Sequence, residues 1–350
     1  MIFILAARPG LVEPKGSMNS LERLNARLAG KPVDKIPNMN IFMSIIAREA
    51  GVSYSGYVQD YRKLVEGNLI CAEKYGLDSV SVISDPMREA SAYGTKVVFP
   101  ENGVPYAEVP LISDDFNLSV LNRFDPLDSP RTLDRVRACE LLRQKAGDYP
   151  VIGWIEGGLA ESADLRGIND FLMDLAEEET YLDDLFAILF AQQKRFAKAQ
   201  IDAGADFIGI GNAVASLIGP KLYERYGFNW DKAIIGYIHE QGARVKLHIC
   251  GDITSLLEML TQTGADIVDI DWMVDFGYAV RLFEGTATAV SGNFNPAGAI
   301  LRGSVQETQD DVRRCIEQGT GTTLIAGGCE IPAATPDENL LAMDRMLYLC

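Results

Sequence analysis

The sequence predicts a single-domain (β/α)8 barrel, the TIM-barrel fold, in which parallel strands alternate with helices. Eight short apolar or β-branched runs occur along the chain, each bounded by polar or glycine-rich turn residues. The segments between the runs carry apolar residues with the 3.6-residue period of helices. Eight is the number of strands that closes a parallel barrel. The runs cover residues 38–43, 79–84, 151–155, 206–210, 245–250, 266–270, 287–291 and 322–326.

The helical pattern is clearest in the second half of the chain. Residues 170–200 are long enough for two helices, and shorter amphipathic stretches cover residues 255–263, 304–318 and 336–349. Glycine-rich helix ends precede three of the predicted strands, at residues 241–243, 264–265 and 319–321. These signals support an alternation of helix and strand over most of the sequence.

Two regions depart from this alternation. Residues 92–121 contain the alternating segment KVVFPENGVPYAEVP, which predicts a β-hairpin inserted between the second strand and its return helix. Residues 1–17 open with a short apolar run and continue into a turn-rich stretch, and a helical pattern starts at Met18. We therefore expect residues 1–17 to be an N-terminal extension outside the fold, and residues 18–350 to form the barrel domain.

Composition excludes several classes of partner. The chain has 49 acidic and 32 basic residues and a formal charge of −17, so neither nucleic acid nor an anionic membrane surface is expected as a partner. No apolar run reaches the roughly 18 residues of a membrane span. Six irregularly spaced cysteines do not resemble a secreted disulfide framework, which favours a cytoplasmic protein.

In a TIM barrel the catalytic groups lie where strands end, on the loops that follow them. The chemically suggestive side chains of this chain gather at those predicted ends. They are Asp85 with Glu89, Glu156, Asn212, His248 with Cys250, Asp271, Asn293 with Asn295, and Cys329.

His248 and Cys250 are two residues apart on a predicted strand, so their side chains share one face. Cys329 follows two glycines at the end of the eighth run, and the ends of barrel strands converge on one axis. One histidine and two cysteines form a ligand set typical of zinc, and three protein ligands leave one position open, as in catalytic sites. Zinc in such a site would deprotonate a substrate thiol and make it a nucleophile.

The His-x-Cys pair alone is a weak signal, because a buried cysteine usually acts as a small apolar residue. Cys71, Cys139 and Cys315 lie on predicted amphipathic helices and are expected to be structural. His239 is expected near the exposed end of a helix, so His248 has no competitor as a histidine ligand. The sequence does not identify the fourth ligand: the carboxylates of Asp252, Asp271 and Glu330 are all near enough to occupy that position.

Five segments of the chain carry a family resemblance: KPVDKIP (31–37), SDPMREASAYG (84–94), HICGDITSLLEMLTQTGADIVDID (248–271), SGNFNP (291–296) and GGCEIPAATP (327–336). They resemble the uroporphyrinogen decarboxylase superfamily, and more closely its zinc-dependent branch, the methylcobamide:coenzyme M methyltransferases and related corrinoid-dependent enzymes. The likeness runs from about Met18 to the end.

The resemblance implies zinc bound by His248, Cys250 and Cys329, a small thiol at the open position, and a methylated corrinoid carried by a separate protein. It also implies that Asp85 occupies the position of an aspartate that decarboxylases use to hold pyrrole nitrogens; here it would line the substrate cavity or cap the following helix. Asn293 resembles a Gly-Asn signature, with a structural or a substrate-binding role. Glu156 would polarise a ligand or be solvated, and Asn212 completes the expected substrate-binding set.

The sequence leaves three alternative functions to compare with methyl transfer to a thiol. A uroporphyrinogen decarboxylase needs no metal and would need several arginines around the first strand for its octacarboxylate substrate, where only Arg48 is present. A corrinoid methyltransferase could work in the donor direction, demethylating a methoxyarene, a methylamine or a methylthio compound with the same metal site. A barrel that only carries corrinoid or porphyrin would have no use for three zinc ligands.

Overall fold

The computed structural model describes residues 17–121 and 123–348, and its centre is a curled sheet of seven parallel strands. The strand order is β1-β4-β5-β6-β7-β8-β9, so neighbours in the sheet follow one another along the chain. The strands are β1 (Val80–Ser81), β4 (Val151–Glu156), β5 (Phe207–Gly211), β6 (Arg244–Ile249), β7 (Ile267–Ile270), β8 (Ala289–Phe294) and β9 (Leu324–Gly327). These match seven of the eight predicted runs.

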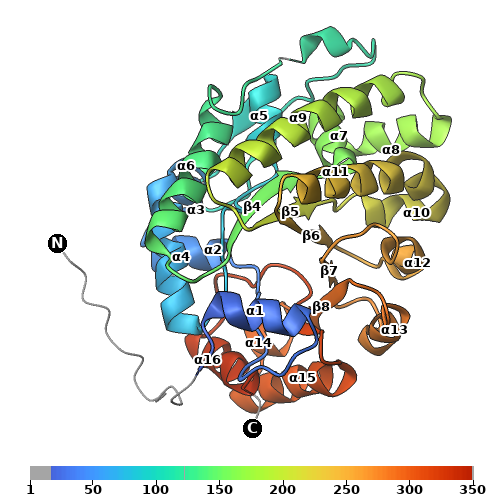
Figure 1. Cartoon of the computed structure of the whole chain (residues 1–350). Coiled ribbons are helices and arrows are strands. Elements are labelled where there is room, and N and C mark those ends of the chain that lie inside the picture. The colour runs from blue at the N-terminus through green and yellow to red at the C-terminus, as the bar shows by residue number, and fades with distance from the viewer. Residues whose placement is uncertain (1–16, 122, 349–350) are drawn as a thin grey trace.

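Helices surround the sheet on its outer side (Figure 1). In the first half of the chain they are α1 (Ser20–Leu28), α2 (Ser44–Glu49), α3 (Tyr54–Gln59), α4 (Tyr61–Tyr75), α5 (Met87–Tyr93), the 3-10 turn η1 (Leu118–Val120), α6 (Pro130–Lys145), α7 (Gly158–Arg166) and α8 (Ile168–Glu177). The rest are α9 (Leu182–Asp202), α10 (Ala215–Tyr223), the π-helical turn η2 (Glu224–Phe228), α11 (Asn229–Glu240), the 3-10 turn η3 (Thr254–Leu256), α12 (Leu257–Leu260), α13 (Phe276–Leu282), α14 (Ala299–Arg302), α15 (Val305–Gln318) and α16 (Asp337–Met346).

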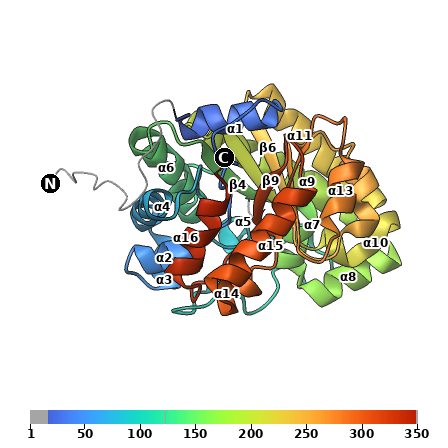
Figure 2. The ribbon, with the colours of Figure 1, turned by 90° about the horizontal axis from the view of Figure 1, so that it is seen from below.

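The two helices predicted within residues 170–200 are confirmed as α8 and α9, and α15 and α16 match the last two amphipathic stretches. The stretch at 255–263 is shorter than predicted, because it forms only η3 and α12. Helices from the two ends of the chain meet: α16 packs beside α4, as Figure 2 shows. No helix in the described part of the chain is long and apolar enough to cross a membrane.

The predicted first strand at residues 38–43 is wrong, and within residues 17–121 and 123–348 no eighth strand closes the barrel by a backbone ladder. The segment is extended and buried between β1 and β9, but side chains make several of its bonds. The Gly327 N–H donates to Oδ1 of Asn40 at 2.8 Å, and the Asn38 N–H donates to a carboxylate oxygen of Asp78 at 2.8 Å. Because asparagine and aspartate side chains compete with backbone pairing, the ladder stops here.

Residues 92–121 form mostly turns and loops. Their regular pairing is limited to β2 (Val97–Val98) and β3 (Tyr106–Ala107), which run antiparallel with Val97 opposite Ala107 and Val98 opposite Tyr106. The hairpin is thus much shorter than the predicted alternation, because the Pro and Gly residues on either side interrupt it.

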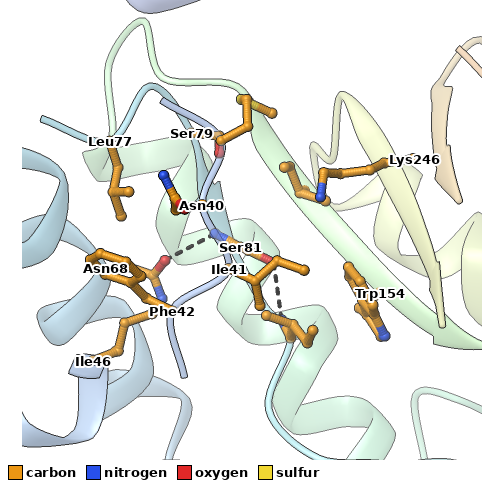
Figure 3. Close-up of a pocket in the computed structure, with 13 residues that line it drawn as sticks. Asn40, Ile41, Phe42, Ile46, Asn68, Leu77, Ser79, Ser81, Trp154 and Lys246 are labelled. Carbon is orange, nitrogen blue, oxygen red and sulfur yellow. Dashed lines mark hydrogen bonds between the residues drawn. The ribbon is translucent and has the colours of Figure 1, made fainter. Parts of the chain in front are cut away.

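The amino-terminal ends of the strands are closed by α1. Leu24 on α1 packs in one apolar cluster with strand-start residues that include Ile152, Phe207 and Ile267. Inside the sheet lies a cavity of about 20 Å³ lined by Lys246 and Trp154 on one side (Figure 3), which has room for about one water molecule.

Candidate metal centre

The candidate metal centre is built on the end of β6. His248 is the fifth residue of this strand and is 6 % exposed, and Cys250 directly follows the strand. Alternation along β6 places Lys246, His248 and Cys250 on the same face, with Leu247 and Ile249 buried on the other. Gly251 then turns the chain with a φ of +89°, a conformation that favours glycine.

Cys329 arrives from the loop after β9 and meets this pair. Nε2 of His248 lies 3.0 Å from Sγ of Cys250 and 3.8 Å from Sγ of Cys329, and the two sulfurs are 3.3 Å apart. The loop can approach so closely because Gly328 has no side chain: a Cβ there would lie 2.3 Å from the backbone nitrogen of Trp272. The sequence-predicted ligands are therefore brought together at one point.

The donor set and its spacing fit a zinc ion. In a tetrahedral site with bonds of about 2.0–2.3 Å, neighbouring ligand atoms are about 3.5 Å apart, which is close to the three distances here. Among the described residues, these three form the single group of His, Cys, Asp or Glu ligand atoms within 4.8 Å of one another. Two sulfurs and one imidazole nitrogen are soft to borderline ligands, which zinc prefers over magnesium or calcium.

The centre is already polarised toward a thiolate. The hydrogen bond with Cys250, helped by His248, lowers the pKa of Cys329 to about 4 against the opposing effect of burial. The same bond, together with burial, raises the pKa of Cys250. The two thiols therefore favour a state in which they share one proton, and a thiolate is the form that binds metal.

The three carboxylates expected near a fourth position all have other partners. Asp252 accepts from the backbone and hydroxyl of Thr254, and Glu330 accepts from the backbone and hydroxyl of Ser44 at 2.7 Å. Asp271 accepts from the N–H groups of Gly251 and Trp272. None of them belongs to the three-residue group.

Two residues behind His248 were missed from the sequence. Asp269 lies opposite His248 in the β6–β7 register, and its carboxylate is 3.3 Å from Nδ1 of the imidazole. The same carboxylate accepts from Lys246 and forms a buried ion pair. Burial opposes protonation of His248, but the hydrogen bonds to Asp269 and Cys329 raise its pKa to about 9. The sequence signal that could have identified these two residues is a charged side chain inside an apolar run: Lys246 in VKLHIC and Asp269 in DIVDI.

Asp85 and Glu156 enter a buried ionic network at the ends of β1 and β4. Asp85 accepts from Arg131 at 2.6 Å and from the Met87 N–H at 3.1 Å, so it both pairs with an arginine and binds the first N–H of α5. Arg88 donates to Glu156 at 2.7 Å. Burial raises the pKa of Glu156 to about 7, although Arg88 acts in the opposite direction.

The two asparagines of the predicted substrate-binding set are held by protein groups. Asn212 donates to both carboxylate oxygens of Asp231 at 3.0 Å. Asn293 donates to the carbonyl oxygens of Asp271 at 3.1 Å and Val274 at 2.7 Å, and so fixes the loop after β7. A substrate contact for either side chain stays a prediction.

Comparison with known proteins identifies the family of this chain. The family model described as uroporphyrinogen decarboxylase (URO-D) matches residues 19–347. The chain belongs to the uroporphyrinogen decarboxylase family. Among solved structures, a methyltransferase from Methanosarcina mazei aligns with a TM-score of 0.85 over 94 % of this chain and 98 % of that one, at 22 % identity. That likeness shows a shared fold.

Within the family, identity alone does not separate the branches. Methylcobamide:CoM methyltransferase MtbA of Methanosarcina mazei is 26 % identical over 92 % of this chain and 95 % of its own length. Uroporphyrinogen decarboxylase of Geobacter metallireducens is 25 % identical over 91 % of this chain and 96 % of its own length. The two values are nearly equal, so the choice between activities depends on the site.

Proposed function

We propose that this chain is a zinc-dependent methyltransferase that moves a methyl group between the corrinoid of a partner protein and a small thiol. The observation that carries the proposal is the convergence of His248, Cys250 and Cys329 within 4.8 Å at the carboxyl-terminal rim. A metal-free decarboxylase would have no need of such a group.

Bound zinc would supply a Lewis acid that keeps a sulfur ligand in its nucleophilic thiolate form. The protein's own residues hold the ligand set in place. Asp269 fixes the ring of His248 from behind, and Gly328 lets the Cys329 loop lie against the loop after β7. With Asp252, Asp271 and Glu330 otherwise engaged, the fourth position is left for the thiol.

One further observation supports this branch over the decarboxylases. Arg48, the arginine next to the predicted first strand, donates to the carbonyl oxygens of Ala333 and Thr335 and pairs with Asp337, so its guanidinium is not directed at a polycarboxylate. The five cysteines in the described ranges form no disulfide, which supports a reducing compartment such as the cytoplasm.

The proposal is tested by mixing the purified protein with methylcobalamin and a panel of small thiols. Thiol-dependent demethylation, followed by the visible spectrum of the cobalamin, is the expected result, and Cys329→Ser protein serves as the metal-deficient control. No reaction with any thiol, together with cobalt methylation from methoxyarenes, methylamines or methylthio compounds, would establish the donor direction instead. No reaction in either direction would refute the proposal.

A further inference from the structure

The two cysteines of the candidate metal centre come from distant parts of the sheet. Cys250 follows β6 and Cys329 follows β9, and β7 and β8 lie between these strands. Neighbouring strands are about 4.8 Å apart, so three such spacings separate the two strands, yet the sulfurs lie 3.3 Å apart. Residues 271–274, the loop after β7, lie along this path, and we call them the bridging loop.

The bridging loop contacts the sequence neighbour of each cysteine. On one side, the carboxylate of Asp271 accepts from the N–H of Gly251, the residue after Cys250, at 2.7 Å. On the other side, a Cβ on Gly328, the residue before Cys329, would lie 2.8 Å from the carbonyl carbon and 2.9 Å from Cα of Asp271. One residue is therefore bonded to the Cys250 loop and packed directly against the Cys329 loop.

The position of the bridging loop is set from β8. Asn293 on this strand donates to the carbonyl oxygens of Asp271 at 3.1 Å and Val274 at 2.7 Å. The Val274 N–H donates back to the carbonyl oxygen of Asp271 at 3.1 Å, which closes the turn. Asp271 and Asn293 are 6 % and 2 % exposed, so little water competes for these bonds. The turn is thus anchored at both of its ends.

We propose that Asp271 is a positioning residue that sets the distance between Cys250 and Cys329, and that Asn293 holds it in place. The inference deepens the proposed function and rests on it, because it concerns the same metal centre. Asp271 acts through the backbone of Gly251 and not as a ligand, since its carboxylate lies outside the group of ligand atoms within 4.8 Å of one another.

The chemistry of the Asp271 side chain suits this role. Each of its two oxygens accepts one backbone N–H, from Gly251 at 2.7 Å and from Trp272 at 2.6 Å. An asparagine has one acceptor oxygen, and its amide nitrogen would face the second N–H as another donor. A buried N–H group without an acceptor is costly. Asp271→Asn should therefore loosen the bridging loop without changing any ligand.

Zinc affinity, measured by chelator competition, is the first readout. Asp271→Asn should lower it about tenfold or more, the usual effect of losing a residue that orients a metal ligand. Asp252→Asn is the matched control, because Asp252 is an exposed carboxylate on the same Cys250 loop and accepts from Thr254. This control should bind zinc as tightly as the unaltered protein.

Asn293→Ala should lower zinc affinity in the same way, because it releases the bridging loop from β8. Its matched control is Asn339→Ala. Asn339 is also buried and also donates to two carbonyl oxygens, those of Ile300 and Gly303 at 3.0 Å each, outside the bridging loop. The two variants lose the same kind of bonds, so a general loss of stability would affect both alike.

A second readout needs no zinc. Phenylarsine oxide reacts with two neighbouring thiols, forms two As–S bonds and releases one water molecule. In the zinc-free protein it should bridge Cys250 and Cys329, as located by mass spectrometry of the peptides. An excess of a monothiol should remove this bridge more readily from Asp271→Asn and Asn293→Ala than from the unaltered protein or the two controls.

The outcomes separate this inference from the proposed function. If no thiol is methylated, the proposed function fails, while the arsenical still reports on the spacing of the two cysteines. Equal zinc affinity and equal release of the arsenical in all variants would overturn the inference. Equal losses in Asn293→Ala and Asn339→Ala would overturn it as well, because they would show an effect of stability alone.

Discussion

Asp269 holds His248 by the ring nitrogen opposite the one that faces the two cysteines. Its carboxylate lies 3.3 Å from Nδ1 of His248, while Nε2 lies 3.0 Å from Sγ of Cys250. The carboxylate therefore fixes both the orientation of the imidazole and the nitrogen left to bind metal. Lys246 pairs with the same carboxylate, so the arrangement continues into the interior of the sheet.

Asp269→Asn should lower zinc affinity about 10- to 100-fold, the usual effect of losing such a partner. It should also lower the free energy of unfolding by about 3–5 kcal/mol, because Lys246 is left buried without its counter-charge. Adding Lys246→Met should restore most of the stability but not the affinity. Chelator competition and urea denaturation measure the two effects, and affinity that recovers along with stability would contradict the positioning role.

Zinc content should be about one ion per chain and should depend on each ligand. His248→Ala, Cys250→Ser and Cys329→Ser should each lose most of the metal, as measured by elemental analysis after gel filtration. Cys139→Ala provides a matched control, since Cys139 is fully buried on α6 away from the centre. Full metal retention by all three ligand variants would remove the basis of the proposed function.

Gly328→Ala should disturb the centre without touching a ligand. The added methyl group would lie 2.3 Å from the nitrogen of Trp272 and 2.8 Å from the carbonyl carbon of Asp271, both backbone atoms. The Cys329 loop must then move, at a cost of about 1–3 kcal/mol, and zinc affinity should fall. Gly321→Ala, at the other end of β9, serves as the control, since its Cβ would lie 4.0 Å from the nearest atom. Equal zinc affinity in the two variants would refute the close-approach argument.

Asp231 should make stability depend on pH. Burial raises its pKa to about 6, although hydrogen bonds from Tyr223 and Asn212 oppose the rise. Between about pH 4 and 6 the folded protein holds this proton and the unfolded chain does not, so this group's contribution to stability falls as pH rises. Relative to Asp231→Asn, the unaltered protein should lose about 3 kcal/mol over that window. Urea denaturation at four pH values would measure it, and a constant difference would contradict the assignment.

The sequence alone was sufficient for the parts of the structure that depend on local periodicity. The alternation in VKLHIC placed His248 and Cys250 on one face, and the position of Cys329 after a run placed it at the same rim. The pairing of His248 with Asp269 was out of reach, because register between strands is set by three-dimensional packing.

The failure at residues 38–43 has a different origin. Apolar content and length predicted a strand, and the segment does lie buried between β1 and β9. The side-chain amides of Asn38 and Asn40 replace the backbone ladder. Asn38 donates to the carbonyl oxygen of Tyr75 and to Asp344, and Asn40 accepts from the Gly327 N–H. Side-chain chemistry at two positions outweighed the hydrophobic pattern.

Metal binding at the candidate centre would also affect folding, because its ligands come from the loop after the last strand of the sheet and from the middle of the sheet. Cys329 lies on the loop after β9, while Cys250 follows β6, three places away in the sheet, and the two sulfurs that meet at 3.3 Å are 79 residues apart in sequence. An ion held by both would fasten the last quarter of the chain to the middle of the sheet. The free energy of metal binding would then contribute to the free energy of folding. The residues that perform the chemistry would therefore also stabilise the fold.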